Sequence, residues 1–288
     1  MRADTLLPER LNLAVARRCP VACRGCYSLF GAGEPDLPRL TASVAVFAAL
    51  GFDRATVSGG DPLSIAGLPE WLGALRTAGM ASIKVDTVGV GLLADDGAPS
   101  GRLLALWPAL DQLGIPLDGA DNRSVLVFRQ GRAALCDETL ALLDALDGLG
   151  GAPRVTINTV VHAGNCSELA AIGRAVLRRR CVSHWNLFQY TATDQAGSGA
   201  NPCFALTDAA FERACAGAIE TLGAAGQRGQ ARIDLRSSRS RLGHYLLVNS
   251  DGDAWLPDDG GRTLRLGSVF GHEREVLDAW RAAVERWH

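Results

Sequence analysis

The stretch RLNLAVARRCPVACRGCYSLFGAGEPDLPRLTASVAVFAALG, from Arg10 to Gly51, begins with a short apolar run and ends with a helical pattern. RLNLAVA (10–16) is typical of a β-strand, and TASVAVFAALG (41–51) is typical of an amphipathic helix. A loop with three cysteines, Cys19, Cys23 and Cys26, separates the two. The stretch therefore predicts a strand, a cysteine loop and a helix, which is one unit of an α/β fold.

The same order of strand and helix recurs five more times along the chain. Six consecutive units favour a parallel sheet covered by helices, either an open doubly wound sheet or a full or partial barrel. The five further strands are expected at RATVSGG (54–60), SIKVDTVGV (82–90), IPLDG (115–119), RVTINTVVH (154–162) and HWNLFQY (184–190). The helices that follow them, in the same order, are expected at LPEWLGALRTAG (68–79), GRLLALWPALDQLG (101–114), LCDETLALLDALDGLG (135–150), CSELAAIGRAVLRRR (166–180) and TDAAFERACAGAIETLGAAG (207–226).

Polar residues recur on one face of several of these strands. Alternation places Asn158 and His162 on the same face of one strand, and Lys84 and Asp86 on the same face of another. Asp118 falls near the C-terminal end of its strand. Strands covered on both faces are normally apolar on both faces, so these residues predict a polar lumen with sites near the strand C-termini. We therefore expect an α/β fold, a partial (β/α)6 TIM-like barrel.

Residues 229–288 have a different pattern and predict a C-terminal extension that packs on a partial barrel formed by residues 1–228. GQARIDLRSSRSR (229–241) is basic and polar, and HYLLVNSDGDAWLP (244–257) predicts a hairpin that turns at Asp251–Gly252. HEREVLDAWRAAVERW (272–287) predicts a final helix.

Composition excludes several classes of function. The chain has 288 residues, of which 48% are hydrophobic, and a net charge of −2 at pH 7. It can bury a sizeable core and has no overall charge that favours a nucleic acid polymer or an anionic membrane. No apolar run reaches transmembrane length, and MRADTLLPER at the N-terminus lacks a signal-peptide pattern. We expect a cytoplasmic protein whose eight cysteines are metal ligands or buried residues rather than disulfides.

The cysteine loop carries the most specific chemistry in the sequence. Three thiolates with the spacing C-x3-C-x2-C can hold three irons of a [4Fe–4S] cluster and leave the fourth iron open to another ligand. A zinc site would need a further, distant ligand, which leaves a zinc-binding interaction protein as the alternative. The other cysteines have no cluster spacing and are expected to be ordinary core or surface residues: Cys136, Cys166, Cys181, Cys203 and Cys215.

The cysteine loop resembles that of the radical S-adenosylmethionine (SAM) superfamily, in which the open iron chelates SAM. A second motif, VSGGDPL (57–63), closes the second expected strand. It is similar to the Gly-Gly-Glu-Pro segment of that family, which receives the amino group of SAM, with aspartate in place of the usual glutamate. Glycines let the backbone approach a ligand closely, and a carboxylate accepts hydrogen bonds from an ammonium group.

The resemblance implies roles for individual residues. Many family members have an aromatic residue before the third cysteine, whereas this chain has Gly25 there and Tyr27 after the cysteine. The expected metal ligands are Cys19, Cys23 and Cys26. The expected cofactor-binding residues are Tyr27, Gly59, Gly60, Asp61, Pro62, Asp86, Thr87 and His162. The expected catalytic or substrate-binding residues are Asp118, Asn158, Gln189 and Tyr190.

TINTVVHAGN, WNLFQY, TDAAFERA and GHYLLVNSDGDAW occur in the same order as related segments of viperin-like proteins, which act on cytidine triphosphate. Where those proteins have basic residues, this chain has Thr156, His184 and Asn186. We therefore expect a substrate with little negative charge, unless the basic stretch around Arg236, Arg239 and Arg241 supplies a phosphate grip. DGDAWLP (251–257) is similar to the start of the cysteine-rich extensions of peptide-modifying relatives, but no cysteine follows Cys215.

The resemblance implies two cofactors, a [4Fe–4S] cluster and SAM, and an enzyme that cleaves SAM reductively. The product is a 5′-deoxyadenosyl radical, which abstracts hydrogen from a small molecule or a short peptide, as in secondary-metabolite biosynthesis. An electron donor such as flavodoxin or ferredoxin is an implied partner. A viperin-like nucleotide dehydratase and a peptide-modifying enzyme are the alternatives within the family.

Overall fold

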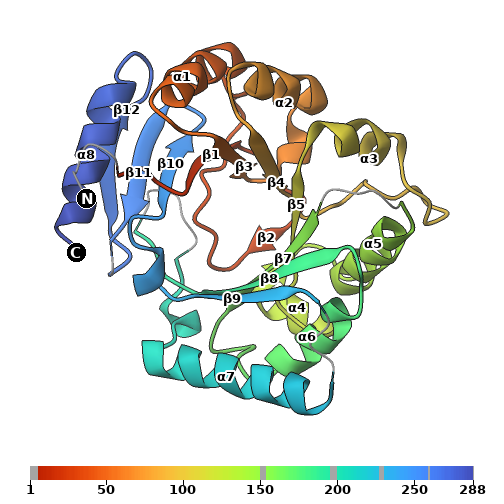
Figure 1. The fold of residues 1–288 in the computed structure, drawn as a ribbon. Helices are drawn as coiled ribbons and strands as arrows, with labels where there is room; N and C mark the ends of the chain where they lie inside the picture. The colour runs from red at the N-terminus through yellow and green to blue at the C-terminus, as the bar shows by residue number, and fades with distance from the viewer. Residues whose placement is uncertain (1–5, 150–153, 195–199, 227–229, 259, 288) are drawn as a thin grey trace.

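The computed structural model describes residues 6–149, 154–194, 200–226, 230–258 and 260–287. Its ten-stranded sheet curves around a central space and has the order β12-β11-β10-β1-β3-β4-β5-β7-β8-β9 (Figure 1). The predicted strands form its middle: β1 (Arg10–Ala16), β3 (Arg54–Gly59), β4 (Ser82–Asp86), β5 (Gln112–Pro116), β7 (Arg154–Val161) and β8 (Val182–Gln189). Each of these pairs in parallel with the next. Because the outer strands β12 and β9 do not pair with each other, the predicted partial barrel is confirmed.

Helices cover the outside of the curved sheet (Figure 1). The six that follow the barrel strands are α1 (Leu37–Ala49), α2 (Leu68–Thr77), α3 (Gly101–Leu106), α5 (Leu135–Leu149), α6 (Leu169–Leu177) and α7 (Asp208–Ala224). A short helix that the sequence did not predict, α4 (Asn122–Phe128), precedes α5. The strands β2 (Ala22–Cys23) and β6 (Arg129–Gln130) form a separate small sheet at the cysteine loop.

Alternation along the strands separates the core from the lumen. On β1 the side chains of Leu11, Leu13 and Val15 are fully buried, whereas Asn12 between them lines a central cavity. Trp185 and Leu187 on β8 are likewise buried, and Asn186 faces the cavity. The apolar face of each strand therefore packs under the helices, and the polar face is left for a site.

The third helix–strand boundary was predicted wrongly. The helix expected over 101–114 stops at Leu106 and continues only as a 3-10 turn, η3 (Trp107–Ala109), before Gln112 begins β5. Pro108 lacks a backbone N–H and its ring blocks helical continuation, which explains the early end. The strand expected over 115–119 consequently lies three residues earlier, at Gln112–Pro116.

The C-terminal residues extend both edges of the same sheet. β9 (Arg232–Arg236), which the sequence did not predict as a strand, pairs in parallel with β8. β10 (Tyr245–Asn249) pairs in parallel with β1 and forms the predicted hairpin with β11 (Asp253–Pro257). An unpredicted strand, β12 (Thr263–Ser268), and the predicted helix, α8 (Glu273–Glu285), complete this part. The expected boundary at 228/229 lies outside the described residues, so the division into two domains stays a prediction.

No helix in the described parts of the chain has the length and apolar character needed to cross a membrane.

Candidate active site

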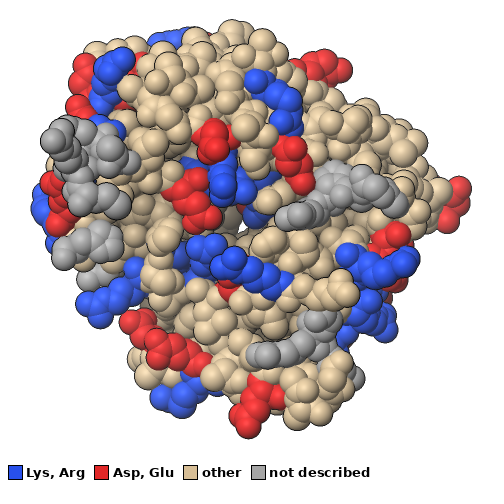
Figure 2. Space-filling model, viewed as in Figure 1, with Lys and Arg blue, Asp and Glu red and all other residues tan. Residues whose placement is uncertain are grey.

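A cavity of about 580 Å³ occupies the centre of the curved sheet. Its lining includes the cysteine loop, residues of all eight parallel strands and the turn after β9. Figure 2 shows acidic and basic side chains gathered around a hollow in the middle of the face that it presents. The cavity is large enough for small ligands, since such sites commonly measure several hundred cubic ångströms.

The three loop cysteines lie together on this cavity. Cys19, Cys23 and Cys26 are each half-buried and line its wall. The backbone N–H of Ser28 donates to the Cys26 Sγ at 3.4 Å, and Arg129 Nη1 donates to the Cys23 Sγ at 3.2 Å. Burial raises the pKa of the Cys19 thiol to about 12, so a metal must displace its proton on binding.

This donor set suits an iron–sulfur cluster better than a single zinc ion. Three cysteines that hold a cubane bind three different irons, whereas zinc ligands must converge on one ion. Within the described ranges, no three or more histidine, cysteine, aspartate or glutamate side chains form a group that could hold one metal ion. The loop therefore fits the expected [4Fe–4S] group through its residue types, its spacing and its shared cavity.

The glycine pair of VSGGDPL packs against the backbone that leads into the cysteine loop. A Cβ at Gly60 would lie 2.4 Å from the Arg18 carbonyl oxygen, and one at Gly59 would lie 2.6 Å from the backbone of Ala16. Gly59 also has φ of 115°, which favours glycine. Both glycines line the cavity beside the cysteines, with Ser28 Oγ donating to the Gly59 carbonyl. Only glycine permits this close approach.

The structure corrects the role expected for Asp61. Its carboxylate is 2% exposed and does not line the cavity. One oxygen accepts hydrogen bonds from Thr87 Oγ1 at 2.7 Å and Leu63 N at 2.9 Å, and the other accepts from Val88 N at 2.9 Å. Both oxygens are thus engaged in joining the end of β3 to the end of β4, which leaves Asp61 poorly placed to receive an amino group.

The other cofactor-site candidates divide in the same way. Thr87 and Asp86 line the cavity, but Pro62 is buried in the turn η2 (Pro62–Ser64) outside it. His162 is fully buried and does not line the cavity; it stacks on Phe128, which does, with ring centroids 5.0 Å apart. Its Nδ1 accepts from Gly164 N at 3.0 Å. Burial lowers the pKa of His162, so it is a neutral core histidine rather than a lumen residue.

An aromatic residue from the end of β8 fills the space that Gly25 leaves open. A Cβ at Gly25 would lie 2.5 Å from the ring of Tyr190, whose hydroxyl accepts from Asn201 N at 2.9 Å. Tyr27, which follows Cys26, is half-exposed at the cavity, with its ring centroid 6.1 Å from that of Trp255. Both tyrosines line the cavity near the cysteines.

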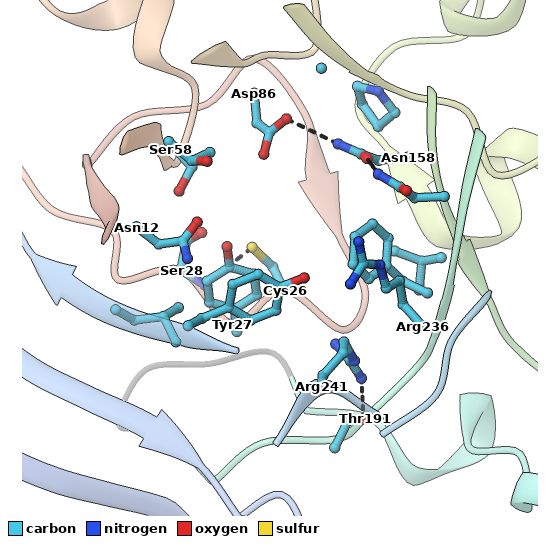
Figure 3. A pocket seen from close by; sticks show the side chains of 18 of the residues that line it. Asn12, Cys26, Tyr27, Ser28, Ser58, Asp86, Asn158, Thr191, Arg236 and Arg241 are labelled. Atoms are coloured by element: carbon cyan, nitrogen blue, oxygen red, sulfur yellow. Dashed lines mark hydrogen bonds between the residues drawn. The ribbon is translucent and has the colours of Figure 1, made fainter. Parts of the chain in front are cut away.

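A hydrogen-bonded row of polar side chains runs along the inner face of the sheet from β4 over β5 to β7 and β8. Lys84 Nζ lies 2.9 Å from Asp86 Oδ1, and Asn158 Nδ2 donates to the same oxygen at 3.0 Å. Asn186 Nδ2 donates in turn to Asn158 Oδ1 at 3.0 Å. The row passes over Gly114 of β5, where a Cβ would lie 1.7 Å from Asp86 Oδ1. Figure 3 shows Asp86 and Asn158 joined at one side of the pocket.

Two of the expected catalytic residues are occupied elsewhere. Gln189 uses its amide nitrogen on Leu206 O and Asp208 Oδ1, each at 3.0 Å, and its amide oxygen on Ser238 N at 2.8 Å. Asp118 is fully buried outside the cavity lining, accepts from Val160 N at 2.7 Å and forms an ion pair with Arg129 at 2.6 Å. Asn158, Gln189 and Tyr190 line the cavity, and of these three Gln189 has both ends of its amide hydrogen-bonded to other parts of the chain.

The sequence analysis missed several polar residues that line the cavity. Arg10 and Asn12 lie opposite the buried leucines of β1, so the alternation in RLNLAVA carried the signal for them. Arg129 follows α4 and reaches the cysteine loop through a contact that no local pattern indicates. Of the basic stretch that the sequence analysis named as a possible phosphate grip, Arg236 and Arg241 line the cavity, whereas Arg239 between them is exposed. The lumen therefore contains more cationic groups than the neutral residues of β7 and β8 predict.

Several solved structures of other proteins have a fold similar to that of this chain. No protein-family model and no curated protein sequence match the chain. Streptococcus suis SuiB bound to its precursor peptide SuiA aligns with a TM-score of 0.70 and 12% identity, over 96% of this chain and 66% of that one. Native anSMEcpe with bound AdoMet and the Cp18Cys peptide aligns with a TM-score of 0.65 and 12% identity, over 96% of this chain and 83% of that one.

A third solved structure, the FeFe-hydrogenase maturase HydG from Carboxydothermus hydrogenoformans, aligns with a TM-score of 0.50 and 12% identity, over 81% of this chain and 61% of that one. The chain spans about 60–66% of the length of SuiB in the three SuiB structures. These neighbours are radical SAM enzymes. The chain therefore has the partial-barrel fold of radical SAM enzymes.

Proposed function

We propose that this chain is a radical SAM enzyme whose [4Fe–4S] cluster is held by Cys19, Cys23 and Cys26. The observation that carries the proposal is that these three thiols and the Gly59–Gly60 backbone open onto one cavity of a partial barrel. When bound, the cluster and SAM supply a 5′-deoxyadenosyl radical after one-electron reduction, and that radical abstracts hydrogen from the substrate. An electron donor such as flavodoxin or ferredoxin would deliver the electron.

The residues of the chain would bind and orient the cluster and SAM and would enclose them in the cavity. Cys19, Cys23 and Cys26 would hold three irons, and the tight packing of Gly59 and Gly60 keeps bulky side chains away from SAM. Tyr27 lines the wall beside the cysteines and would limit access of water to the radical. Cofactors of this kind carry the hard chemistry, while the protein supplies position and exclusion of side reactions.

We infer that the substrate is a small molecule or a short peptide held by the polar row of the lumen. Asn158 and Asp86 offer hydrogen-bonding groups at the cavity. The peptides bound in the SuiB and anSMEcpe structures support a peptide substrate, although those chains share only 12% identity with this one. A cytoplasmic location fits a loop of three free thiols, because thiols stay reduced in that compartment.

The test begins with anaerobic reconstitution of the full-length protein. We expect about four irons per chain, the content of one cubane, and a brown colour with absorbance near about 400 nm. Under dithionite, SAM should be converted to 5′-deoxyadenosine. Cys26→Ala should abolish this conversion and most of the iron, whereas Cys203→Ala, which alters an exposed cysteine outside the loop, should change neither.

Retention of a full iron complement by Cys26→Ala would contradict the cluster assignment. A reproducible content near eight irons would reveal a second cluster among the other cysteines. A colourless protein with one zinc per chain would favour the zinc-binding interaction protein instead.

A viperin-like nucleotide dehydratase is the second candidate, and the arginines at the cavity favour it. It predicts that cytidine triphosphate stimulates formation of 5′-deoxyadenosine and is itself dehydrated. Equal rates with and without each nucleoside triphosphate would exclude this candidate and leave a peptide or another small molecule.

A further inference from the structure

Most of the cationic groups at the cavity have a carboxylate partner. The close pairs are Lys84 with Asp86 at 2.9 Å, Arg129 with Asp118 at 2.6 Å and Arg232 with Asp234 at 2.7 Å. Such pairs offset the cost of taking a charge out of water. A cation that lines the same cavity without such a partner is therefore informative, because another group must offset the free-energy cost of removing its charge from water.

Arg241 is such a cation. Its Nη2 donates to Gln189 O and Thr191 Oγ1, each at 2.8 Å, and its Nε donates to Ser237 O at 3.2 Å. Among the described residues, no carboxylate oxygen lies within 4.0 Å of its guanidinium nitrogens. Burial lowers the pKa of Arg241, with Tyr245 and Tyr27 opposing the shift. The fold thus holds a guanidinium in place through neutral acceptors alone.

Arg236 lies beside it and is only weakly paired. It occupies the last position of β9, in register with Phe188 of β8, and the guanidinium of Arg241 lies 5.8 Å from the centre of the Phe188 ring. Its carboxylate neighbour, Glu9, is 3.6 Å away and also 3.4 Å from His244. Figure 3 shows Arg236 and Arg241 facing the same open space, across from Asp86 and Tyr27.

We propose that Arg236 and Arg241 bind an anionic group of the substrate, a phosphate or a carboxylate. This inference deepens the proposed function and rests on it. Three hydrogen bonds orient Arg241 through its Nε–H and Nη2–H donors, which leaves the Nη1–H donors for an oxygen of such a group, and Arg236 offers a second guanidinium. An anion between the two arginines would supply Arg241 with a counter-charge that the described carboxylates do not, and would add a second one to Arg236 beside Glu9. The expectation of a substrate with little negative charge is revised accordingly.

The anionic group belongs to the substrate rather than to SAM. SAM would bind beside the cysteine loop and the Gly59–Gly60 backbone at the end of β3. Arg236 is on β9, which lies across the central space from β3, and four strands separate the two in the sheet (Figure 1). Arg241 follows β9 in the turn η5 (Arg239–Arg241), and its charge interacts with Tyr27 next to the third cysteine. The Arg236 side of the lumen is therefore available to the second ligand.

The test measures binding of inorganic pyrophosphate to the cluster-loaded, full-length protein by isothermal titration calorimetry. Loss of one charge-assisted contact should weaken pyrophosphate binding about tenfold to a hundredfold in Arg241→Gln. Arg236→Gln should also weaken it and leaves the hydrogen bonds of Arg241 in place. Arg239→Gln is the matched control, because Arg239 belongs to the same basic stretch but is exposed and does not line the cavity.

A thermal melt of each variant identifies any loss of fold, and Arg236→Gln carries the test if Arg241→Gln does not fold. SAM affinity, measured in parallel, should be the same in all variants. The proposal is overturned if wild-type protein does not bind pyrophosphate, if Arg239→Gln weakens binding as much as the other two changes, or if SAM affinity falls with pyrophosphate affinity, since the anion is then the SAM carboxylate. Formation of 5′-deoxyadenosine by the wild type tests the proposed function separately, so that the two can fail independently.

Discussion

Arg129 joins the deepest charge of the barrel to the cysteine loop. Its Nε lies 2.6 Å from Asp118 Oδ2, where the Asp118 side chain is 0% exposed, and its Nη1 donates to the Cys23 Sγ. Burial opposes its charge, but Asp118 and Cys23 raise the pKa of Arg129 overall. The guanidinium is therefore charged at every relevant pH and is the partner that permits a buried carboxylate.

Replacing Arg129 with glutamine should leave the Asp118 carboxylate buried without a cation. We expect the free energy of unfolding of the cluster-free protein to fall by about 3–5 kcal/mol, measured by urea denaturation. Arg132→Gln is the matched control, because the Arg132–Glu138 pair is 39% and 38% exposed and should contribute at most about 1 kcal/mol. Equal effects from the two changes would show that burial does not strengthen the Arg129 pair.

Gly25 and Tyr190 should be energetically coupled, although they lie far apart in the sequence. Gly25→Ala places a Cβ against the Tyr190 ring, which is held by Phe128 and Phe204, and should cost about 1–3 kcal/mol of stability. The same change should cost much less in a Tyr190→Ala background, and the difference is the coupling energy of a double-mutant cycle.

Gly217→Ala provides the control for glycine replacement itself. Gly217 lies inside α7, where an added Cβ would meet no other atom within 4 Å, so alanine should stabilise the protein by about 0.5–1 kcal/mol. A Gly25→Ala cost that persists unchanged without the tyrosine ring would locate the strain in the backbone of the loop instead.

Among the helices, strands and loops, those that depend on a local pattern of residues were predicted from the sequence. The cysteine loop, the Gly59–Gly60 turn and the six barrel strands are each encoded within a few consecutive residues. The contacts of Arg129 with Cys23 and of Tyr190 with Gly25 depend on segments that meet only in the folded chain, so no local pattern indicates them. β9 was missed although RIDLR alternates, because its three charged residues, which face the lumen, made the segment resemble the basic and polar stretch that follows it and outweighed Ile233 and Leu235 on the other face.

The carboxylate of Asp147 connects α5 to the residues just before β8, and this connection depends on its ionisation. Asp147 lies in α5, and its oxygens accept from Cys181 N and Arg180 N just before β8. Burial raises the pKa of Asp147, but the hydrogen bonds from Cys181 and Arg180 outweigh it and lower the pKa overall. A carboxyl group whose pKa is lower in the folded state stabilises the protein above its unfolded pKa and loses that contribution as the pH falls.

We therefore expect Asp147→Asn to be less stable than wild type at pH 7, and the difference to shrink as the pH falls below about 4. Thermal melts at a series of pH values measure this difference. Asp95→Asn alters an exposed aspartate with no helix-connecting role and should show no such trend. A difference between wild type and Asp147→Asn that is constant with pH would assign the effect to packing rather than to charge.

At the scale of the whole molecule, the C-terminal strands are part of the barrel sheet. β10 covers the edge of β1, and β9 covers the edge of β8. Leu246 and Val248 of β10 are buried at 0% and 1% exposure, and Trp280 of α8 donates from Nε1 to Tyr245 O at 2.9 Å. Arg236 and Arg241, which we assign to substrate binding, also come from this part. The extension therefore supplies both a wall of the site and the cover of two strand edges.

Deleting residues 230–288 should consequently prevent folding of the remaining barrel. The deletion uncovers the hydrogen-bonding edges of β1 and β8 together with the buried side chains that pack on β10, and exposed edges of this kind promote aggregation. We expect the shortened chain to elute in the void volume on size exclusion and to lose its cooperative thermal transition. The control is Arg286→Ala, which alters an exposed residue directly after α8 and should leave both properties unchanged. A monomeric, cooperatively melting product of the longer deletion would instead establish that the remaining chain forms an independent barrel and that the C-terminal strands are an accessory layer.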